Sequence, residues 1–184
     1  GTNGTAGYTT ATSASGTIAD VVNALEATTN WTSTNHMALT ADTSDKQEGT
    51  GSLANAITTT AAANEQWYFN YGSASNWGGI NDTGNLRVGY WVKSSVTTSS
   101  GDLSWQDDDS ANLASPLDTI AVPALTANTW TYASATLGAT TRGSILSYGL
   151  RYTTDLGAAT VKADAISSIF DAADATTNWT GRGG

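Results

Sequence analysis

The side chains that most often carry out catalysis are nearly absent from this chain. His36 is the only histidine and there is no cysteine, so neither a thiol nucleophile nor a thiolate metal site is available, and one histidine is too few for a zinc site. No serine lies in a G-x-S-x-G pattern, and no phosphate-binding or dinucleotide-binding glycine motif is present. The 16 Asp and Glu residues could supply paired carboxylates for glycoside hydrolysis, but their spacing selects no pair. We therefore expect no enzymatic activity.

The densest run of carboxylates is Asp107, Asp108 and Asp109. Consecutive residues of a strand point to opposite faces, so these three carboxylates do not converge on one point. We interpret the run as a solvated loop, with part of a cation site as the alternative.

Tryptophan is the residue type best suited to binding in this chain, which contains seven Trp and seven Tyr. The apolar C–H faces of sugars stack on aromatic rings, while sugar hydroxyls require Asp, Asn, Gln or Arg nearby. Trp77 lies in a glycine-containing loop, and Arg87 and Trp91 share one face of a predicted strand. The candidate carbohydrate contacts are Trp67, Trp77, Arg87, Trp91 and Trp105.

The alternative for these tryptophans is the hydrophobic core. Leu, Ile, Val and Phe together number only 28 residues, so a core has to use aromatic side chains, each of which buries roughly 150–250 Å². Trp31 and Trp130 are the strongest core candidates.

The charge balance limits the possible partners. Sixteen acidic residues against seven Lys and Arg give a net charge of −9, which argues against nucleic acid and against an anionic membrane surface. An acidic surface suits solubility and cation binding.

The composition and periodicity predict an all-β fold. Thr, Ala, Ser and Gly make up 99 of the 184 residues, and β-branched Thr favours pleated sheet. Residues 18–27 are a weak helix candidate that could also be a strand. Eight further segments have strand character and are separated by turn-rich clusters, which is typical of a jelly-roll β-sandwich. They are residues 52–60, 65–71, 86–93, 102–107, 118–122, 129–137, 144–153 and 159–168.

An internal repeat defines the predicted domain limits. Residues 21–32 recur as residues 169–180, and the six residues from Ala27 to Thr32 are identical in the second copy. The repeat therefore predicts one module over residues 21–168. We expect an extended arm over residues 1–20 and a C-terminal arm over residues 169–184 that resembles the start of a second module.

The order of these landmarks resembles carbohydrate-binding-module jelly rolls of the CenC type and similar galactose-binding-like sandwiches. The resemblance covers about residues 21–168. It depends on an acidic residue before Trp31-Thr32, a turn and strand over residues 45–53, the strand Tyr90-Trp91-Val92-Lys93, Trp130-Thr131, and a closing strand with Asp164. Modules of this kind occur in secreted polysaccharide-degrading enzymes and in structural proteins of tailed bacteriophages.

The resemblance also implies a structural Ca²⁺ that joins the opening segment to the closing strand. The matching carboxylates are Glu26 and Asp164, and the turn at Glu48–Gly49 would supply a backbone carbonyl. Ca²⁺ takes six to eight oxygen ligands and tolerates irregular geometry. The closing strand has Ala163 where the family often has a second acid, so the chain supplies one carboxylate fewer.

Three functions remain open on the sequence alone. The first is a non-catalytic virion surface module, of capsid-decoration or tail-fibre type, that contacts its own copies or other virion proteins through its arms. The second is a carbohydrate-binding module of a secreted enzyme, and the third is a subunit of an extracellular filament or surface layer. Each places the chain on a virion surface or outside the cell, with a cell-surface polysaccharide as a possible ligand.

Overall fold

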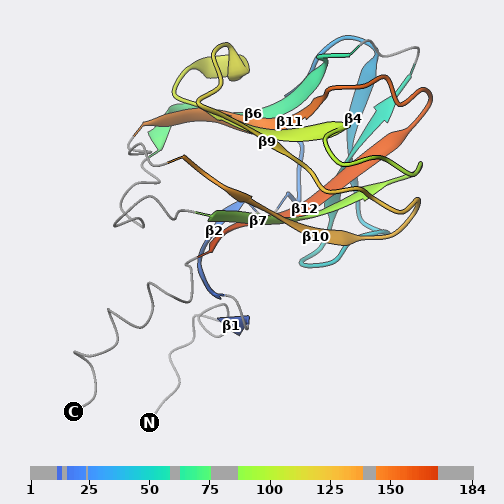
Figure 1. Cartoon of the computed structure of the whole chain (residues 1–184). Coiled ribbons are helices and arrows are strands. Elements are labelled where there is room, and N and C mark those ends of the chain that lie inside the picture. Colours follow the sequence, from blue (N-terminus) through green and yellow to red (C-terminus); the bar gives the residue numbers. More distant parts are fainter. Residues whose placement is uncertain are drawn as a thin grey trace.

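The computed structural model is a sandwich of two antiparallel β-sheets (Figure 1). It describes residues 12–13, 16–23, 25–58, 63–75, 87–138 and 144–169. Within these ranges no helix has the length and apolar character needed to cross a membrane.

The first sheet has seven strands, in the order β1-β2-β12-β5-β4, with β7 on the other edge of β12 and β10 beyond β7. The central strand β12 pairs with β5 along its first half, with β2 along its second half, and with β7 on its opposite edge. The strands are β1 (Thr12–Ser13), β2 (Gly16–Asn23), β4 (Met37–Asp42), β5 (Ser52–Ile57), β7 (Arg87–Ser94), β10 (Thr131–Thr136) and β12 (Thr160–Ile169).

The second sheet has five strands in the order β3-β6-β11-β8-β9. They are β3 (Trp31–Ser33), β6 (Gln66–Ser75), β11 (Ile145–Tyr152), β8 (Leu103–Asp108) and β9 (Asp118–Ala121). The short 3₁₀ helix η2 (Ala111–Leu113) lies over the outer face of this sheet, at the top of Figure 1.

Aromatic rings fill the space between the sheets. Trp105 of β8 stacks on Tyr90 of the opposite sheet with 5.1 Å between ring centroids, and on Tyr148 of β11 at 5.7 Å. Trp31 packs against Trp67 at 5.5 Å. All five rings are buried, so the aromatic core expected from the composition is present.

The alternation of side chains along each strand determines the two outer faces. In β10, Ala133 and Ala135 are buried while Tyr132 and Ser134 are exposed. All six residues of β8 are buried, because the segment after it folds back over its outer face.

The jelly-roll sandwich expected from the sequence is confirmed, and each of the eight predicted strands is present. Residues 18–23 belong to strand β2 rather than to a helix, and because β2 begins at Gly16 the sheet includes the last residues of the expected N-terminal arm. Strands β3 and β4 were not predicted, since their Thr, Ser and Ala residues give no clear alternation. Residues 1–11 and 170–184, which make up most of the two expected arms, lie outside the described residues.

The structure corrects the interpretation of the acidic run at residues 107–109 as a solvated loop. Asp107 and Asp108 are fully buried in β8, and only Asp109 is exposed. The expected solvated loop begins two residues later, at Asp109, because the Asp108 carboxylate accepts hydrogen bonds from the segment that covers the sheet.

Replacing Trp105 with Ala is expected to lower the free energy of unfolding by roughly 3–5 kcal/mol, since it leaves a large cavity between the sheets. Leu117→Ala is the control, because Leu117 is 42% exposed and its loss should change stability by less than about 0.5 kcal/mol. Urea denaturation measures both. Equal midpoints for Trp105→Ala and the wild type would contradict the core assignment.

Candidate functional site

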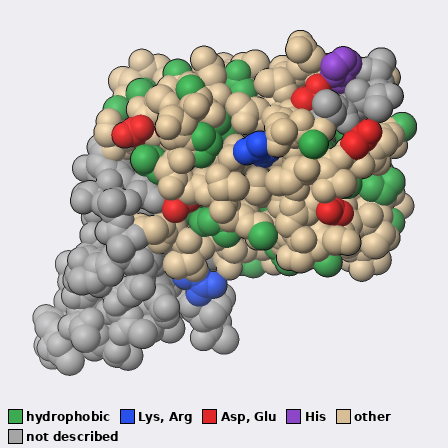
Figure 2. Space-filling view, turned by 45° about the horizontal axis from the view of Figure 1, so that its top comes forward, with side chains coloured by type: hydrophobic (Ala, Val, Ile, Leu, Met, Phe, Trp, Pro, Cys, Tyr) green, Lys and Arg blue, Asp and Glu red, His purple; other side chains and the backbone are tan. Residues whose placement is uncertain are grey.

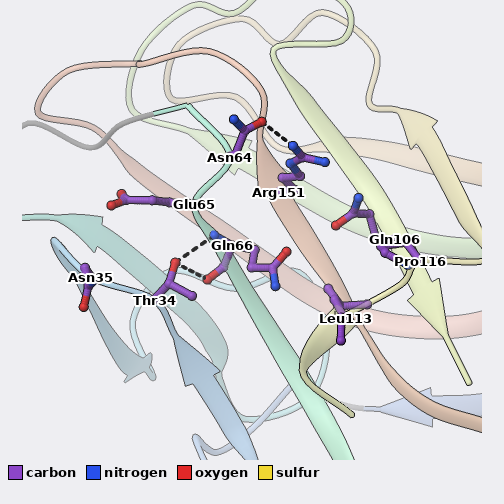
Figure 3. A pocket seen from close by; sticks show the side chains of 10 residues that line it. Thr34, Asn35, Asn64, Glu65, Gln66, Gln106, Leu113, Pro116 and Arg151 are labelled. Atoms are coloured by element: carbon purple, nitrogen blue, oxygen red, sulfur yellow. Dashed lines mark hydrogen bonds between the residues drawn. The ribbon is translucent and has the colours of Figure 1, made fainter. Parts of the chain in front are cut away.

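A hollow of about 380 Å³ lies on the outer face of the five-stranded sheet. Gln66 of β6, Gln106 of β8 and Arg151 of β11 contribute polar side chains to it, and Leu113 and Pro116 line one wall (Figure 3). Figure 2 shows few charged side chains on the visible face of the molecule.

Strand register brings these residues together. Arg151 pairs with Gln66 on one side, and Gly149 pairs with Tyr68 and Gln106 on its two sides, so two adjacent rows cross the sheet. Glycine is required at 149, because an added Cβ would lie 2.2 Å from the backbone oxygen of Trp67. The hollow therefore depends on a close approach of β6 to β11.

Three buried polar atoms of the residues that line this hollow have no hydrogen-bond partner: Glu65 Oε2, Gln106 Oε1 and Arg151 Nε. Gln106 Nε2 donates to Thr119 Oγ1 at 3.0 Å, which fixes the orientation of the amide. Arg151 Nη2 donates to Asn64 Oδ1, which holds the guanidinium at the rim. Buried polar atoms are normally paired, so an unpaired acceptor and an unpaired donor in one hollow are suited to a polar ligand.

The wall of the hollow is held by buried polar contacts. Asp108 accepts hydrogen bonds from the backbone amides of Ser110 at 2.9 Å and Ser115 at 2.8 Å. The amide of Leu113 donates to Ser147 Oγ at 2.9 Å, and Gln66 Nε2 donates to the carbonyl of Asn112 at 2.9 Å. These bonds anchor the η2 segment at both ends and in its middle.

A hydrogen bond between His36 and Glu65 lies at the edge of the hollow. His36 Nδ1 lies 2.6 Å from Glu65 Oε1, and Glu65 lines the hollow. The second carboxylate oxygen, Glu65 Oε2, is buried without a hydrogen-bond partner. The contact with His36 holds the Glu65 side chain in position at this edge.

The predicted sugar contacts do not gather in this hollow. Trp67 and Trp105 are 0% and 1% exposed in the core, which corrects the expectation that their rings face a ligand. Arg87 and Trp91 share one face of β7 as predicted, but that face is the outer surface of the other sheet. Trp77 lies outside the described residues.

Sequence reasoning missed Gln66, Gln106 and Arg151. The alternation of residues 65–71 puts Gln66 on the face opposite Trp67, which is a partial signal. Nothing in the sequence shows that residues 66, 106 and 151 meet, since their proximity comes from strand pairing.

The three residues predicted to bind a metal meet at one loop. Asp164 is fully buried, and its Oδ2 accepts hydrogen bonds from the amides of Gln47 at 2.7 Å and Glu48 at 2.9 Å. The amide of Thr50 donates to both carboxylate oxygens of Glu26 at 2.9 Å. The Glu48 carboxylate instead accepts from the indole Nε1 of Trp91 at 3.2 Å, so it is engaged on the outer face of the sheet.

The electrostatics of Glu26 and Asp164 differ. Burial raises the pKa of Asp164, and the nearby Glu26 carboxylate adds to this rise against the hydrogen bonds from the loop amides. The hydrogen bond from the Thr50 side chain lowers the pKa of Glu26. Within the described ranges, no group of three or more His, Cys, Asp or Glu residues is arranged for a metal ion.

Four charged side chains form a cluster next to this loop. Lys162 Nζ lies 2.7 Å from Asp42 Oδ2 and 2.6 Å from Asp45 Oδ2, and Lys93 Nζ lies 2.9 Å from the same Asp45 oxygen. Trp130, which is half-buried rather than fully in the core, donates its Nε1 to Asp45 at 2.9 Å. The cluster fixes the loop against strands β7 and β12.

The cluster shifts the ionisation of both aspartates. Burial alone would raise the pKa of Asp45, but hydrogen bonds from Lys162, Lys93 and Trp130 outweigh it and lower that pKa to about 2. The hydrogen bond from Lys162 is the main cause of the lowered pKa of Asp42.

The chain matches known proteins in structure, whereas the sequence comparisons found no match. No protein-family model matches the sequence, and no curated protein matches it. Among solved structures, the CBM22-1 xylan-binding domain of Xyn10C from Paenibacillus barcinonensis aligns with a TM-score of 0.52 at 15% identity, covering 88% of this chain and 99% of that one. The family 11 carbohydrate-binding module of the cellulase Lic26A-Cel5E from Clostridium thermocellum aligns with a TM-score of 0.54 at 12% identity, covering 83% and 94%.

A third match is part of a larger enzyme. The CBM22-1 and GH10 modules of xylanase 10B from Clostridium thermocellum, determined with xylohexaose, align with a TM-score of 0.54 at 16% identity over 80% of this chain. This chain spans only 27% of that structure.

The chain has the fold of a carbohydrate-binding module. The resemblance identified from the sequence is thereby confirmed at the level of fold, which is what identities of 12–16% support. These relatives are non-catalytic modules or contain one within an enzyme, and none of the three is a virion protein.

The lowered pKa values of Asp42 and Asp45 predict how stability depends on pH. Both folded pKa values lie below the ordinary value of 3.8, so their contribution is present above about pH 4 and declines as the pH falls. The contribution of Asp45 is lost through its folded pKa of about 2, and that of Asp42 at still lower pH. Lys162→Met should destabilise the protein at pH 7 by roughly 1 kcal/mol. Thermal melts from pH 7 to pH 2 measure this, and the difference between the two proteins should shrink toward the acid end. A constant difference across that range would contradict the assignment.

Proposed function

We propose that the chain is a non-catalytic carbohydrate-binding module that binds polysaccharide in the hollow beside Gln106 and Arg151. The fold supports this proposal, as does the position of the hollow on an outer sheet face lined by amide and guanidinium groups.

The observation that carries the proposal is the unpaired acceptor at Gln106 Oε1 together with the unpaired donor at Arg151 Nε. A hydroxyl group both donates and accepts hydrogen bonds, so sugar hydroxyls can satisfy both atoms. The volume of about 380 Å³ is in the usual range of small-molecule sites, roughly 300–1,000 Å³.

The apolar part of the hollow consists of aliphatic side chains, Leu113 and Pro116. Within the described residues no exposed tryptophan lines this hollow, so hydrogen bonds rather than ring stacking would supply most of the specificity. Xylan, which the Paenibacillus domain binds, is the first ligand to test.

Gln106→Met and Arg151→Met each remove one unpaired polar atom and keep most of the side-chain volume. Each is expected to weaken binding of soluble xylan by at least about tenfold in affinity electrophoresis or titration calorimetry, the loss that one hydrogen bond to a charged or buried group produces. Gln47→Met is the matched control, because Gln47 is exposed and lies in a different loop. Unchanged affinity in both hollow variants, with folding confirmed by thermal melts, would overturn the assignment.

We also propose that Glu26 and Asp164 hold a structural Ca²⁺, the ion that the family resemblance implies. Asp164 Oδ1 is buried without a hydrogen-bond partner, and an isolated buried carboxylate oxygen is costly unless a cation or donor meets it. The Glu26 carboxylate lies close enough to add to the raised pKa of Asp164. This donor set is the hard oxygen chemistry that Ca²⁺ prefers, and the ion would cross-link the loop to β12.

Adding CaCl₂ to EDTA-treated protein should raise the melting temperature, by about 5–10 °C at a hundredfold excess over Kd. Asp164→Asn should abolish this rise, whereas Asp109→Asn, at an exposed carboxylate, should keep it. Differential scanning calorimetry measures the effect. An unaltered melting temperature of the wild type at millimolar Ca²⁺ would contradict the metal site.

The virion-surface and filament roles expected from the composition and the terminal repeat stay predictions. Residues 1–11 and 170–184, through which such assemblies would form, are outside the described part of the chain.

A further inference from the structure

Tyr132 is an exposed aromatic ring on the sheet opposite the hollow. Tyr132 is 43% exposed. Among the described residues, Leu117 is the only other large apolar side chain that is exposed. Strand β10 carries Tyr132 on the outer face of the seven-stranded sheet, because its neighbour Ala133 points into the core.

Strand pairing fixes how this ring lies. The Tyr132 hydroxyl makes a side-chain hydrogen bond with Ser167, which is on β12, whereas Tyr132 itself is on β10. Strand β7 runs between β10 and β12, and Ser167 pairs with Gly89 of β7. The ring therefore crosses β7 next to Gly89, which has no side chain beneath it, and Tyr132 stays partly exposed to solvent.

The neighbours of the ring complete a shallow platform. Trp91 packs edge-on against Tyr132, with 5.2 Å between centroids and 65° between planes, and stands beside it as a wall. On the other side of Gly89, Arg87 Nη2 donates to Ser134 Oγ at 3.0 Å, and Arg87 Nε has no hydrogen-bond partner.

We propose that this platform, formed by Tyr132, Trp91 and Arg87, is a second carbohydrate contact that stacks a pyranose ring on Tyr132. The proposal deepens the proposed polysaccharide-binding function and rests on it. The C–H face of a sugar meets the flat ring, and its hydroxyls reach the Arg87 guanidinium and Ser134. Both predicted ligand contacts of β7, Arg87 and Trp91, belong to this surface.

A sugar fits this surface better than the other occupants. A stable protein interface buries about 800 Å² per partner around several apolar anchors, whereas this platform offers one ring and the edge of a second. An anionic ligand is disfavoured by Glu48, whose carboxylate accepts from Trp91 Nε1 at 3.2 Å, and by the net charge of −9.

The test uses the full chain, xylohexaose and cellohexaose as probes, and two NMR reporters. The indole N–H signal of Trp91 reports the platform, and the side-chain amide signal of Gln106 reports the hollow. Saturable shifts of the Trp91 signal are expected in the wild type and in Arg151→Met. Tyr132→Ala should weaken the binding seen at Trp91 by at least about tenfold. Tyr132→Phe, which keeps the ring, is the matched control and should retain more of the binding seen at Trp91 than Tyr132→Ala does.

The outcomes separate the two proposals. Shifts at Gln106 alone, with Trp91 unchanged, would overturn the platform and leave the hollow. Shifts at Trp91 that survive in Tyr132→Ala would also overturn the platform. Unchanged signals at both reporters, with either probe at millimolar concentration, would overturn the platform and the proposed function together.

Discussion

The stack of Tyr90 on Trp105 is the contact on which the rest of the structure depends. The chain has too few large aliphatic side chains for an ordinary sandwich core, so these two rings join the sheets at a centroid distance of 5.1 Å. Adjacent residues of a strand face opposite ways. Because Trp105 points inward, Gln106 points outward into the hollow. Because Tyr90 points inward, Gly89 and Trp91 point outward and form the base and wall of the platform. Both candidate binding surfaces are therefore consequences of how one aromatic pair is buried.

Buried carboxylates complete these surfaces by holding irregular segments in place. Asp108 accepts backbone amides from the segment that contains η2, and that segment forms the wall of the hollow. Asp164 accepts amides from the turn at residues 47–48, and the Glu48 side chain of that turn then accepts from Trp91. A backbone amide donated to a carboxylate forms a charge-assisted hydrogen bond, which is stronger than a neutral one. A chain that is rich in Gly, Ser and Thr lacks bulky side chains to order its loops, and these carboxylates do so instead.

The sequence was sufficient for the fold and insufficient for the site, and the reason is physical. Strand alternation is a local property, so the eight predicted strands and the sandwich could be inferred from residue order. Burial of a tryptophan depends on which face of its strand meets the opposite sheet, which is why Trp67 and Trp91 looked equivalent and are not. The hollow is less local still, because Gln66, Gln106 and Arg151 meet only through the register of three strands. The proposed metal ligands Glu26 and Asp164 were paired by the family resemblance, which spacing alone does not do.

The two proposed surfaces, the hollow and the platform, differ in the kind of contact that they offer a polysaccharide. The hollow offers oriented hydrogen-bonding atoms in fixed positions, which discriminate between hydroxyl configurations. The platform offers a flat ring, which accepts any sugar with an apolar face. The two lie on opposite outer faces of a sandwich whose sheets are about 10 Å apart, so no single sugar ring touches both. A second contact then acts through effective concentration: once one surface holds a chain, a neighbouring segment or chain is presented to the other surface at high local concentration. A polysaccharide matrix supplies such neighbours, so two weak surfaces on one small module can hold it more strongly than either surface alone.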